Sequence, residues 1–247
     1  MPQIIINNLI TNYQKTGSGD ADFILLHGWG CELNIFNNLV SKINQNRYTI
    51  YALDFPGFGK SQMPKEIYGV GEYAKFLKKF IEKLEIKNPI ILGHSFGGRV
   101  AIKFASDYPD VVKRLILTGS EGIKKDLKKS YLFVAKVGKK IFNLPFLKKY
   151  KNKVLEKVGA KDLAESGERE EIFRKVVNQD LREFAKNIKI PTLLIYGIND
   201  DETPIEYGKI FNELISDSRL EIIKNAGHYV FLEQEEEFLN KMDCFLN

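Results

Sequence analysis

A serine between small residues is the strongest chemical signal in this 247-residue sequence. The segment Gly93-His94-Ser95-Phe96-Gly97-Gly98 has the pattern Gly-x-Ser-x-Gly. An apolar run at 90–92 precedes it and a helical pattern over 97–106 follows it, so the serine falls on a turn from strand to helix. The glycines permit a strained turn, and a helix N-terminus favours negative charge nearby. This context predicts that Ser95 is a nucleophile.

A serine hydroxyl needs a base to take its proton, and the base needs an acid to orient it. Only His228 among the histidines follows Ser95 in the chain, in a glycine-containing loop after the apolar run 220–223. We therefore expect His228 to be the base. His27 and His94 lie before the serine, and we interpret both as structural.

The acid is expected between the serine and the base, after a strand. Asp200 follows the apolar run 193–196 by a few residues and is the preferred candidate. Its neighbour Asp201 is an alternative. Glu121, after the preceding apolar run, is a rival, although its simpler interpretation is a carboxylate at the rim of the substrate pocket.

Two backbone amides are needed to stabilise the oxyanion of an acyl-transfer reaction. Phe96 directly follows the proposed nucleophile, and its N–H is one expected donor. The turn His27-Gly28-Trp29-Gly30 follows an early strand, and the N–H of Trp29 is the other. The side chain of Trp29 is also expected to line the substrate pocket.

The elements that must position these residues alternate along the chain. Apolar, β-branched runs predict strands at 23–26, 48–53, 90–92, 115–117, 193–196 and 220–223. Helical spacing predicts helices at 70–85, 97–106, 205–215 and 231–246. This alternation indicates an α/β protein with a doubly wound, mostly parallel sheet. Residues 3–13 resemble part of a hairpin, which predicts an antiparallel N-terminal edge.

The segment 122–188 interrupts this alternation, because it holds helical patches but no strand pattern. We interpret it as a helical cap inserted into a core formed by residues 1–121 and 189–247. From Lys124 to Lys161 it carries thirteen lysines and two acidic residues, in a chain of net charge +5. A solvated surface explains this bias most simply, and docking of an anionic partner is the alternative.

Composition narrows the possible functions. Three histidines and two cysteines without ligand spacing argue against a metal site, and no cofactor is expected. No apolar run approaches the ~18 residues of a membrane span, and no signal-peptide pattern is present. We therefore expect a cytoplasmic protein acting on a small molecule, without integral membrane association. The lysines lack an accompanying nucleic-acid-binding motif, so a nucleic-acid partner is not expected. The oligomeric state is left open.

Nearly the whole chain resembles the α/β-hydrolase superfamily. Besides the serine motif, Asp54–Ser61 is similar to the D-x-P-G-x-G-x-S loop of many members, and residues 27–30 resemble their H-G-x-G turn. Residues 191–197 and 225–228 resemble the segments that carry the acid and the histidine. The resemblance implies a Ser95–Asp200–His228 triad with a cap over the site.

The resemblance implies hydrolysis of a carboxylic ester through an acyl-enzyme, as in carboxylesterases. Hydrolysis of a C–C bond next to a ketone, as in ring-fission hydrolases, uses the same triad and is an alternative. A methyl esterase acting on a carrier-bound pimeloyl ester and a receptor-like binding protein are further alternatives. Dehalogenases and epoxide hydrolases of this fold use an aspartate where this chain has Ser95, so both are disfavoured.

Overall fold

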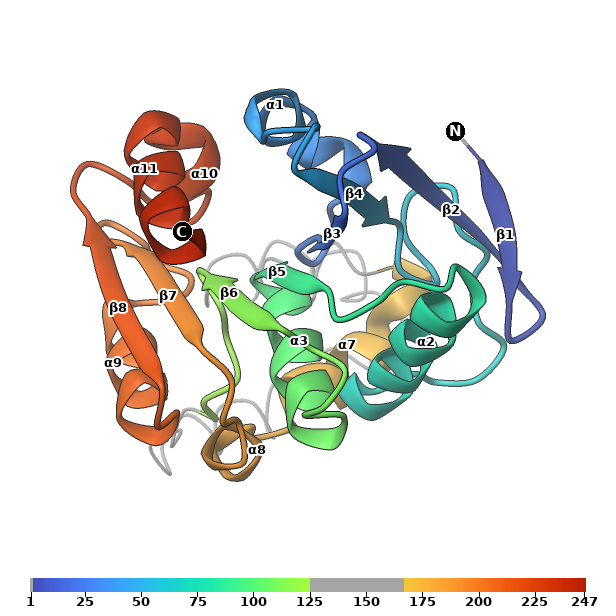
Figure 1. Ribbon diagram of the computed structural model, residues 1–247. Helices are drawn as coiled ribbons and strands as arrows, with labels where there is room; N and C mark the ends of the chain where they lie inside the picture. Colours follow the sequence, from blue (N-terminus) through green and yellow to red (C-terminus); the bar gives the residue numbers. More distant parts are fainter. Residues whose placement is uncertain (1, 125–166) are drawn as a thin grey trace, which may run out of the picture.

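The described part of the chain, residues 2–124 and 167–247 of a computed structural model, is built around one eight-stranded sheet (Figure 1). The strands lie in the order β1-β2-β4-β3-β5-β6-β7-β8. They are β1 Gln3–Ile6, β2 Leu9–Thr16, β3 Ala21–Leu26, β4 Tyr48–Leu53, β5 Ile90–His94, β6 Arg114–Thr118, β7 Thr192–Gly197 and β8 Ser218–Ile223. Pairing from β4 to β8 is parallel, whereas β1 with β2 and β2 with β4 pair antiparallel. The expected sheet with an antiparallel N-terminal edge is therefore confirmed.

Helices cover both faces of this sheet, as a doubly wound fold requires (Figure 1). Those of the described residues are α1 Asn37–Lys42, α2 Val70–Lys83, α3 Phe96–Asp107, α7 Glu170–Val177, α8 Arg182–Lys186, α9 Ile205–Leu214, α10 Val230–Glu233 and α11 Glu235–Leu246, with short 3-10 turns η1 Leu33–Phe36 and η3 Gly167–Arg169. Helices α2, α3 and α9 contribute to one hydrophobic core, and α1, α10 and α11 to the other.

Strand β3 contributes side chains to both hydrophobic cores. Ile24 and Leu26 belong to the core beneath α2 and α3, and Phe23 and Leu25 belong to the core beneath α1 and α11. All four side chains are fully buried. Because both faces of this strand are covered, side chains on either face must be apolar, and the sequence is therefore continuously apolar instead of alternating with polar residues.

The predicted helices at 70–85, 97–106 and 205–215 correspond to α2, α3 and α9. The predicted closing helix at 231–246 was wrong in one respect, because the structure divides this region into α10 and α11. Gln234 lies between them with φ −135° and ψ 58°, which is not a helical conformation. The apolar period continues across this break, so the pattern alone did not reveal it.

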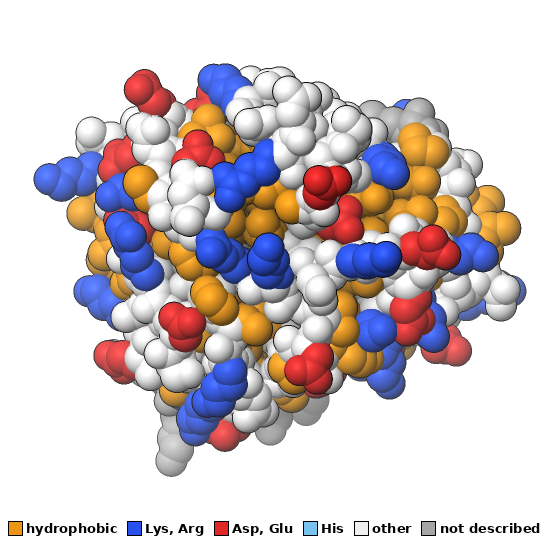
Figure 2. Space-filling model, in the orientation of Figure 1, with side chains coloured by type: hydrophobic (Ala, Val, Ile, Leu, Met, Phe, Trp, Pro, Cys, Tyr) orange, Lys and Arg blue, Asp and Glu red, His pale blue; other side chains and the backbone are white. Residues whose placement is uncertain are grey.

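The predicted cap, 122–188, is described only from Gly167 onward and at its first residues. The described part contains η3, α7 and α8 and no strand, as expected. Most of the lysine-rich stretch lies outside the described residues. On the face drawn in Figure 2, acidic and basic side chains of the described residues are interspersed. The division into core and cap stays a prediction.

Candidate active site

Ser95 lies on the tight turn between β5 and α3. Its backbone has φ 51° and ψ −112°, a conformation that costs energy for a residue with a side chain. The chain can turn this sharply because a Cβ on Gly97 would lie 2.1 Å from the carbonyl oxygen of Leu26, a space only glycine leaves free. The Ser95 N–H donates to the carbonyl of Thr118 at 3.1 Å, which ties the turn to β6. The turn is thus held at the carboxyl ends of the central strands.

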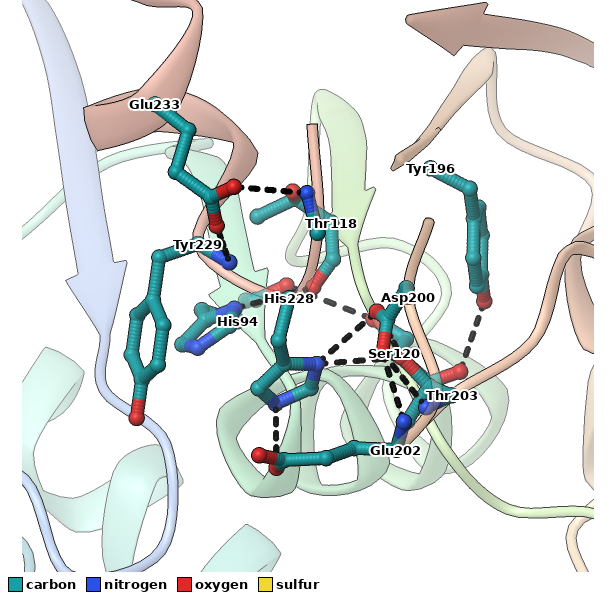
Figure 3. Close-up of polar contacts among 12 residues, drawn as sticks. His94, Thr118, Ser120, Tyr196, Asp200, Glu202, Thr203, His228, Tyr229 and Glu233 are labelled. Carbon is teal, nitrogen blue, oxygen red and sulfur yellow. Dashed lines mark hydrogen bonds and ion pairs between the residues drawn. The ribbon is translucent and has the colours of Figure 1, made fainter. Parts of the chain in front are cut away.

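His228 and Asp200 come together from the loops after β8 and β7. The Nδ1 of His228 lies 2.9 Å from Oδ2 of Asp200 (Figure 3). Because a carboxylate accepts, the Nδ1 carries the proton, and Nε2 is left to exchange a proton with another group. Both side chains are buried. The pair therefore has the geometry of a base oriented by an acid.

The carboxylate of Asp200 is itself held by the turn that follows it. Its Oδ1 accepts from the backbone N–H of Glu202 at 2.9 Å and of Thr203 at 2.8 Å, and its Oδ2 accepts from the Thr203 hydroxyl. Burial alone would raise the pKa of Asp200, but hydrogen bonds from His228 and Thr203 outweigh it and lower the pKa below its usual range. Asp200 is therefore an anion at neutral pH.

Ser95 and His228 line the same cavity, whose volume is about 160 Å³. The turn residues Gly28, Trp29 and Gly30 line it as well. A Cβ placed on Gly28 would lie 3.3 Å from the Cβ of Ser95, so this turn passes close to the serine. The structure thus brings together three segments that are far apart in the sequence.

The two expected oxyanion donors flank the serine. Phe96 is the first residue of α3, so its N–H has no acceptor within the helix. Neither that N–H nor the N–H of Trp29 is a donor in the hydrogen bonds found outside the helices and strands of the described residues. The two aromatic rings pack edge to face at 5.4 Å between their centroids, which fixes the two segments relative to each other.

The other predicted site residues lie apart from this cavity. Glu121 forms an ion pair with the buried Arg99, at 3.0 Å between Oε2 and Nη2. Its carboxylate is not among the described groups that line the cavity. Asp201 is exposed, and the hydrogen bond from His228 is accepted by its neighbour Asp200.

The two remaining histidines are fully buried. His27 contacts the carbonyl of Gly28 through Nδ1 at 2.8 Å, and its Nε2 accepts from the N–H of Phe55 at 3.1 Å. The Nδ1 of His94 lies 3.2 Å from the carbonyl oxygen of Thr118, and its ring is 4.7 Å from that of His228. Burial lowers the pKa of both imidazoles. Both are neutral at pH 7, which agrees with structural roles.

Sequence reasoning missed several groups at this site. Thr203 lies three residues after Asp200 and bonds its carboxylate, a spacing typical of local side-chain turns that was available as a signal. Arg169 and Glu202 line the cavity. Arg169 lies in the predicted cap, and nothing in its local sequence indicates that it approaches the serine.

Comparison with known proteins agrees with the fold. The family model described as alpha/beta hydrolase fold matches residues 23–135. A pimeloyl-[acyl-carrier protein] methyl ester esterase of Wigglesworthia glossinidia brevipalpis is 31% identical, over 93% of this chain and 95% of that protein. A 2-hydroxy-6-oxo-2,4-heptadienoate hydrolase of Pseudomonas putida is 26% identical, over 98% of this chain and 95% of that protein.

Solved structures give the same fold. An esterase from Exiguobacterium antarcticum superposes with a TM-score of 0.79 at 24% identity, covering 98% of both chains. Sheet order, nucleophile turn and sequence similarity together define the class: this chain belongs to the α/β-hydrolase fold family. Its relatives are esterases and other hydrolases.

Two further observations concern the described residues alone. Within residues 2–124 and 167–247, acidic, cysteine and histidine side chains form no group of three that is placed to hold a metal ion. None of the helices in the same ranges is long and apolar enough to cross a membrane.

Proposed function

We propose that this α/β hydrolase is a serine esterase that cleaves a carboxylic ester through an acyl-enzyme. The observation that carries the proposal is the shared cavity. Ser95 lines it on a strained turn, and His228 lines it while its far nitrogen is bonded to Asp200. The proposed oxyanion donors, the N–H groups of Trp29 and Phe96, belong to the segments that flank the serine.

In the first half of the reaction, His228 Nε2 takes the hydroxyl proton of Ser95 as Oγ attacks the ester carbonyl carbon. The carbonyl oxygen becomes an oxyanion, which the two backbone N–H groups stabilise. The C–O bond to the alcohol then breaks, and the alcohol leaves with the proton from Nε2. Asp200 stabilises the positive imidazolium while it exists.

In the second half, water gives a proton to His228 Nε2 and its oxygen attacks the acyl carbon. The bond to Ser95 Oγ breaks, the serine recovers the proton and the carboxylic acid leaves.

The test is hydrolysis of p-nitrophenyl esters of increasing acyl length by wild type and Ser95→Ala. We expect saturable activity in the wild type and a loss of at least about a thousandfold in the variant. Ser41→Ala is the matched control, since Ser41 lies on α1, its hydroxyl donates to the local carbonyl of Asn38, and it is not among the described residues that line the cavity. Equal rates for Ser95→Ala and wild type would disprove the mechanism.

Similarity to particular relatives favours two more specific reactions. Similarity to the Wigglesworthia glossinidia protein favours a carrier-bound methyl ester, with the lysine-rich residues 124–161 as a docking segment for an acidic carrier. Turnover of such a substrate would then weaken at high salt, whereas p-nitrophenyl esters would show little change.

Similarity to the Pseudomonas putida hydrolase favours cleavage of a C–C bond next to a ketone. A folded protein that hydrolyses a ring-fission product and no ester would establish this alternative. Loss of that activity in Ser95→Ala would still place the reaction in the same cavity.

A further inference from the structure

Arg169 brings a positive charge into the cavity that contains Ser95. We propose that its guanidinium binds a carboxylate of the substrate, so that the enzyme prefers esters that carry a second, free carboxylate. This inference rests on the proposed esterase function and extends it to a class of substrate. It concerns a residue of η3, immediately before α7.

The guanidinium of Arg169 is held in place by the loop that follows β4. Its Nη1 donates to the carbonyl oxygen of Gly57 at 2.9 Å, and its central carbon lies 4.8 Å from the ring centroid of Phe58. Phe58 is 1% exposed and packs edge to face on Trp29, at 4.9 Å between centroids. A rigid aromatic surface and one carbonyl thus orient the guanidinium beside the cavity.

Among the described residues, no carboxylate lies within ion-pair distance of Arg169. Of the six other arginines in these ranges, Arg47 and Arg114 bond to oxygens near the C-terminal end. The other four pair with carboxylates: Arg99, Arg174, Arg182 and Arg219. Arg169 instead contacts a carbonyl oxygen and an aromatic ring, and lines the cavity. A guanidinium offers five donors, so one bond to Gly57 leaves donors for a ligand.

The cavity also contains an acidic group, Glu202, and the positions of the two charges differ. One oxygen of Glu202 lies 3.5 Å from Nε2 of His228, and its side chain is 62% exposed. Glu202 is thus beside the base and toward solvent, whereas Arg169 packs on the Gly57–Phe58 loop. A carboxylate matches the planar fork of a guanidinium such as that of Arg169 with two parallel hydrogen bonds.

The test compares two series of p-nitrophenyl esters in wild type, Arg169→Gln and Arg169→Lys. One series contains monoesters of dicarboxylic acids from succinate to adipate. The other replaces the free carboxylate by an isopropyl group of similar shape. The measured quantity is the ratio of kcat/KM between matched anionic and neutral esters, after subtraction of spontaneous hydrolysis. Arg174→Gln is the control, because Arg174 pairs with Glu170 on the surface of the neighbouring helix.

We expect wild type and Arg174→Gln to prefer the anionic ester about tenfold at the best chain length. The ratio should fall to about one in Arg169→Gln and take an intermediate value in Arg169→Lys, which keeps the charge but not the fork. A wild-type ratio of one at every length, or a preference that survives in Arg169→Gln, would overturn the inference.

A binding measurement separates this inference from the proposed function. Calorimetric titration with glutarate is expected to show binding to wild type and to Ser95→Ala, and at least about tenfold weaker binding to Arg169→Gln. If no ester is hydrolysed but this difference is seen, the esterase proposal fails and the carboxylate site stands. Equal binding to all three proteins would refute the site even if ester hydrolysis is observed.

Discussion

Asp54 offers a quantitative test of how the site is held together. Its carboxylate is 1% exposed and joins three segments. Its Oδ1 accepts from the N–H of Leu33 at 2.7 Å, and its Oδ2 accepts from Asn12 Nδ2 at 2.7 Å and from the N–H of Lys60 at 2.9 Å. These bonds connect β2, the start of η1 and the loop after β4. We expect Asp54→Asn to destabilise the protein although the two side chains have nearly the same shape.

The magnitude follows from the hydrogen bonds. An asparagine keeps one acceptor oxygen, and its NH2 group must face at least one donor that Asp54 now satisfies. One charge-assisted bond worth roughly 1.5–3 kcal/mol is then lost, and the others weaken toward neutral bonds of about 1 kcal/mol. Together these changes predict a loss of about 3 kcal/mol in the free energy of unfolding, a large part of a typical domain's stability.

Urea unfolding of wild type, Asp54→Asn and Asp110→Asn measures this loss. Asp110 is exposed in the described structure, so its variant should lie within about 0.5 kcal/mol of wild type. A change of less than about 0.5 kcal/mol in Asp54→Asn would refute the view that this carboxylate organises the loops. We also expect lower kcat/KM, because Leu33 closely follows the turn that carries the proposed oxyanion donor.

Three further predictions concern the acid, the base and pH. Asp200→Asn should lower kcat by about a thousandfold or more on p-nitrophenyl esters, because an amide leaves the imidazole of His228 in the wrong tautomer. The control Asp201→Asn should match wild type, and a near-wild-type kcat in Asp200→Asn would exclude Asp200 as the acid. Glu202→Gln should move the acid limb of the kcat/KM profile to lower pH by about 0.5 unit, because the Glu202 carboxylate lies 3.5 Å from Nε2 of His228 and favours the protonated base. A shift of the acid limb to higher pH would contradict this geometry. Burial lowers the pKa of His94 well below 6.5, so below that pH the unfolded chain binds a proton that the folded chain does not. Between neutral pH and pH 5.5, this residue should therefore lower the free energy of unfolding, measured from urea curves, by about 1.4 kcal/mol, and His94→Asn should lose correspondingly less stability over the same range.

The sequence predicted the elements whose signals are local. The continuous apolar runs became β3 to β8, and the helical stripe at 70–85 became α2, whose apolar face is buried. The turn at Ser95 was predictable because its strain requires small neighbours at a fixed spacing. Chain order indicated His228 and Asp200, although the sequence left Asp201 as an alternative.

Other features depended on contacts between distant residues. The bond from Arg169 to Gly57 and the pairing of Glu121 with Arg99 join segments that have no sequence relation to each other. The same holds for Glu202, whose position beside His228 follows from the path of two separate loops. No local pattern specifies how such segments approach one another.

The sequence by itself determined most of the strands and helices, and therefore that a serine, a histidine and an aspartate meet at one edge of a parallel sheet. The period of the apolar residues, the apolar runs and the spacing of glycines affect the local conformation through neighbours in the chain, so they can be interpreted without the fold. The tertiary structure alone decided which charges enter the cavity beside Ser95 and which are neutralised elsewhere. The physical reason is that the free energy of a charge depends on its burial and on its partners, and both are set by residues far away in the sequence.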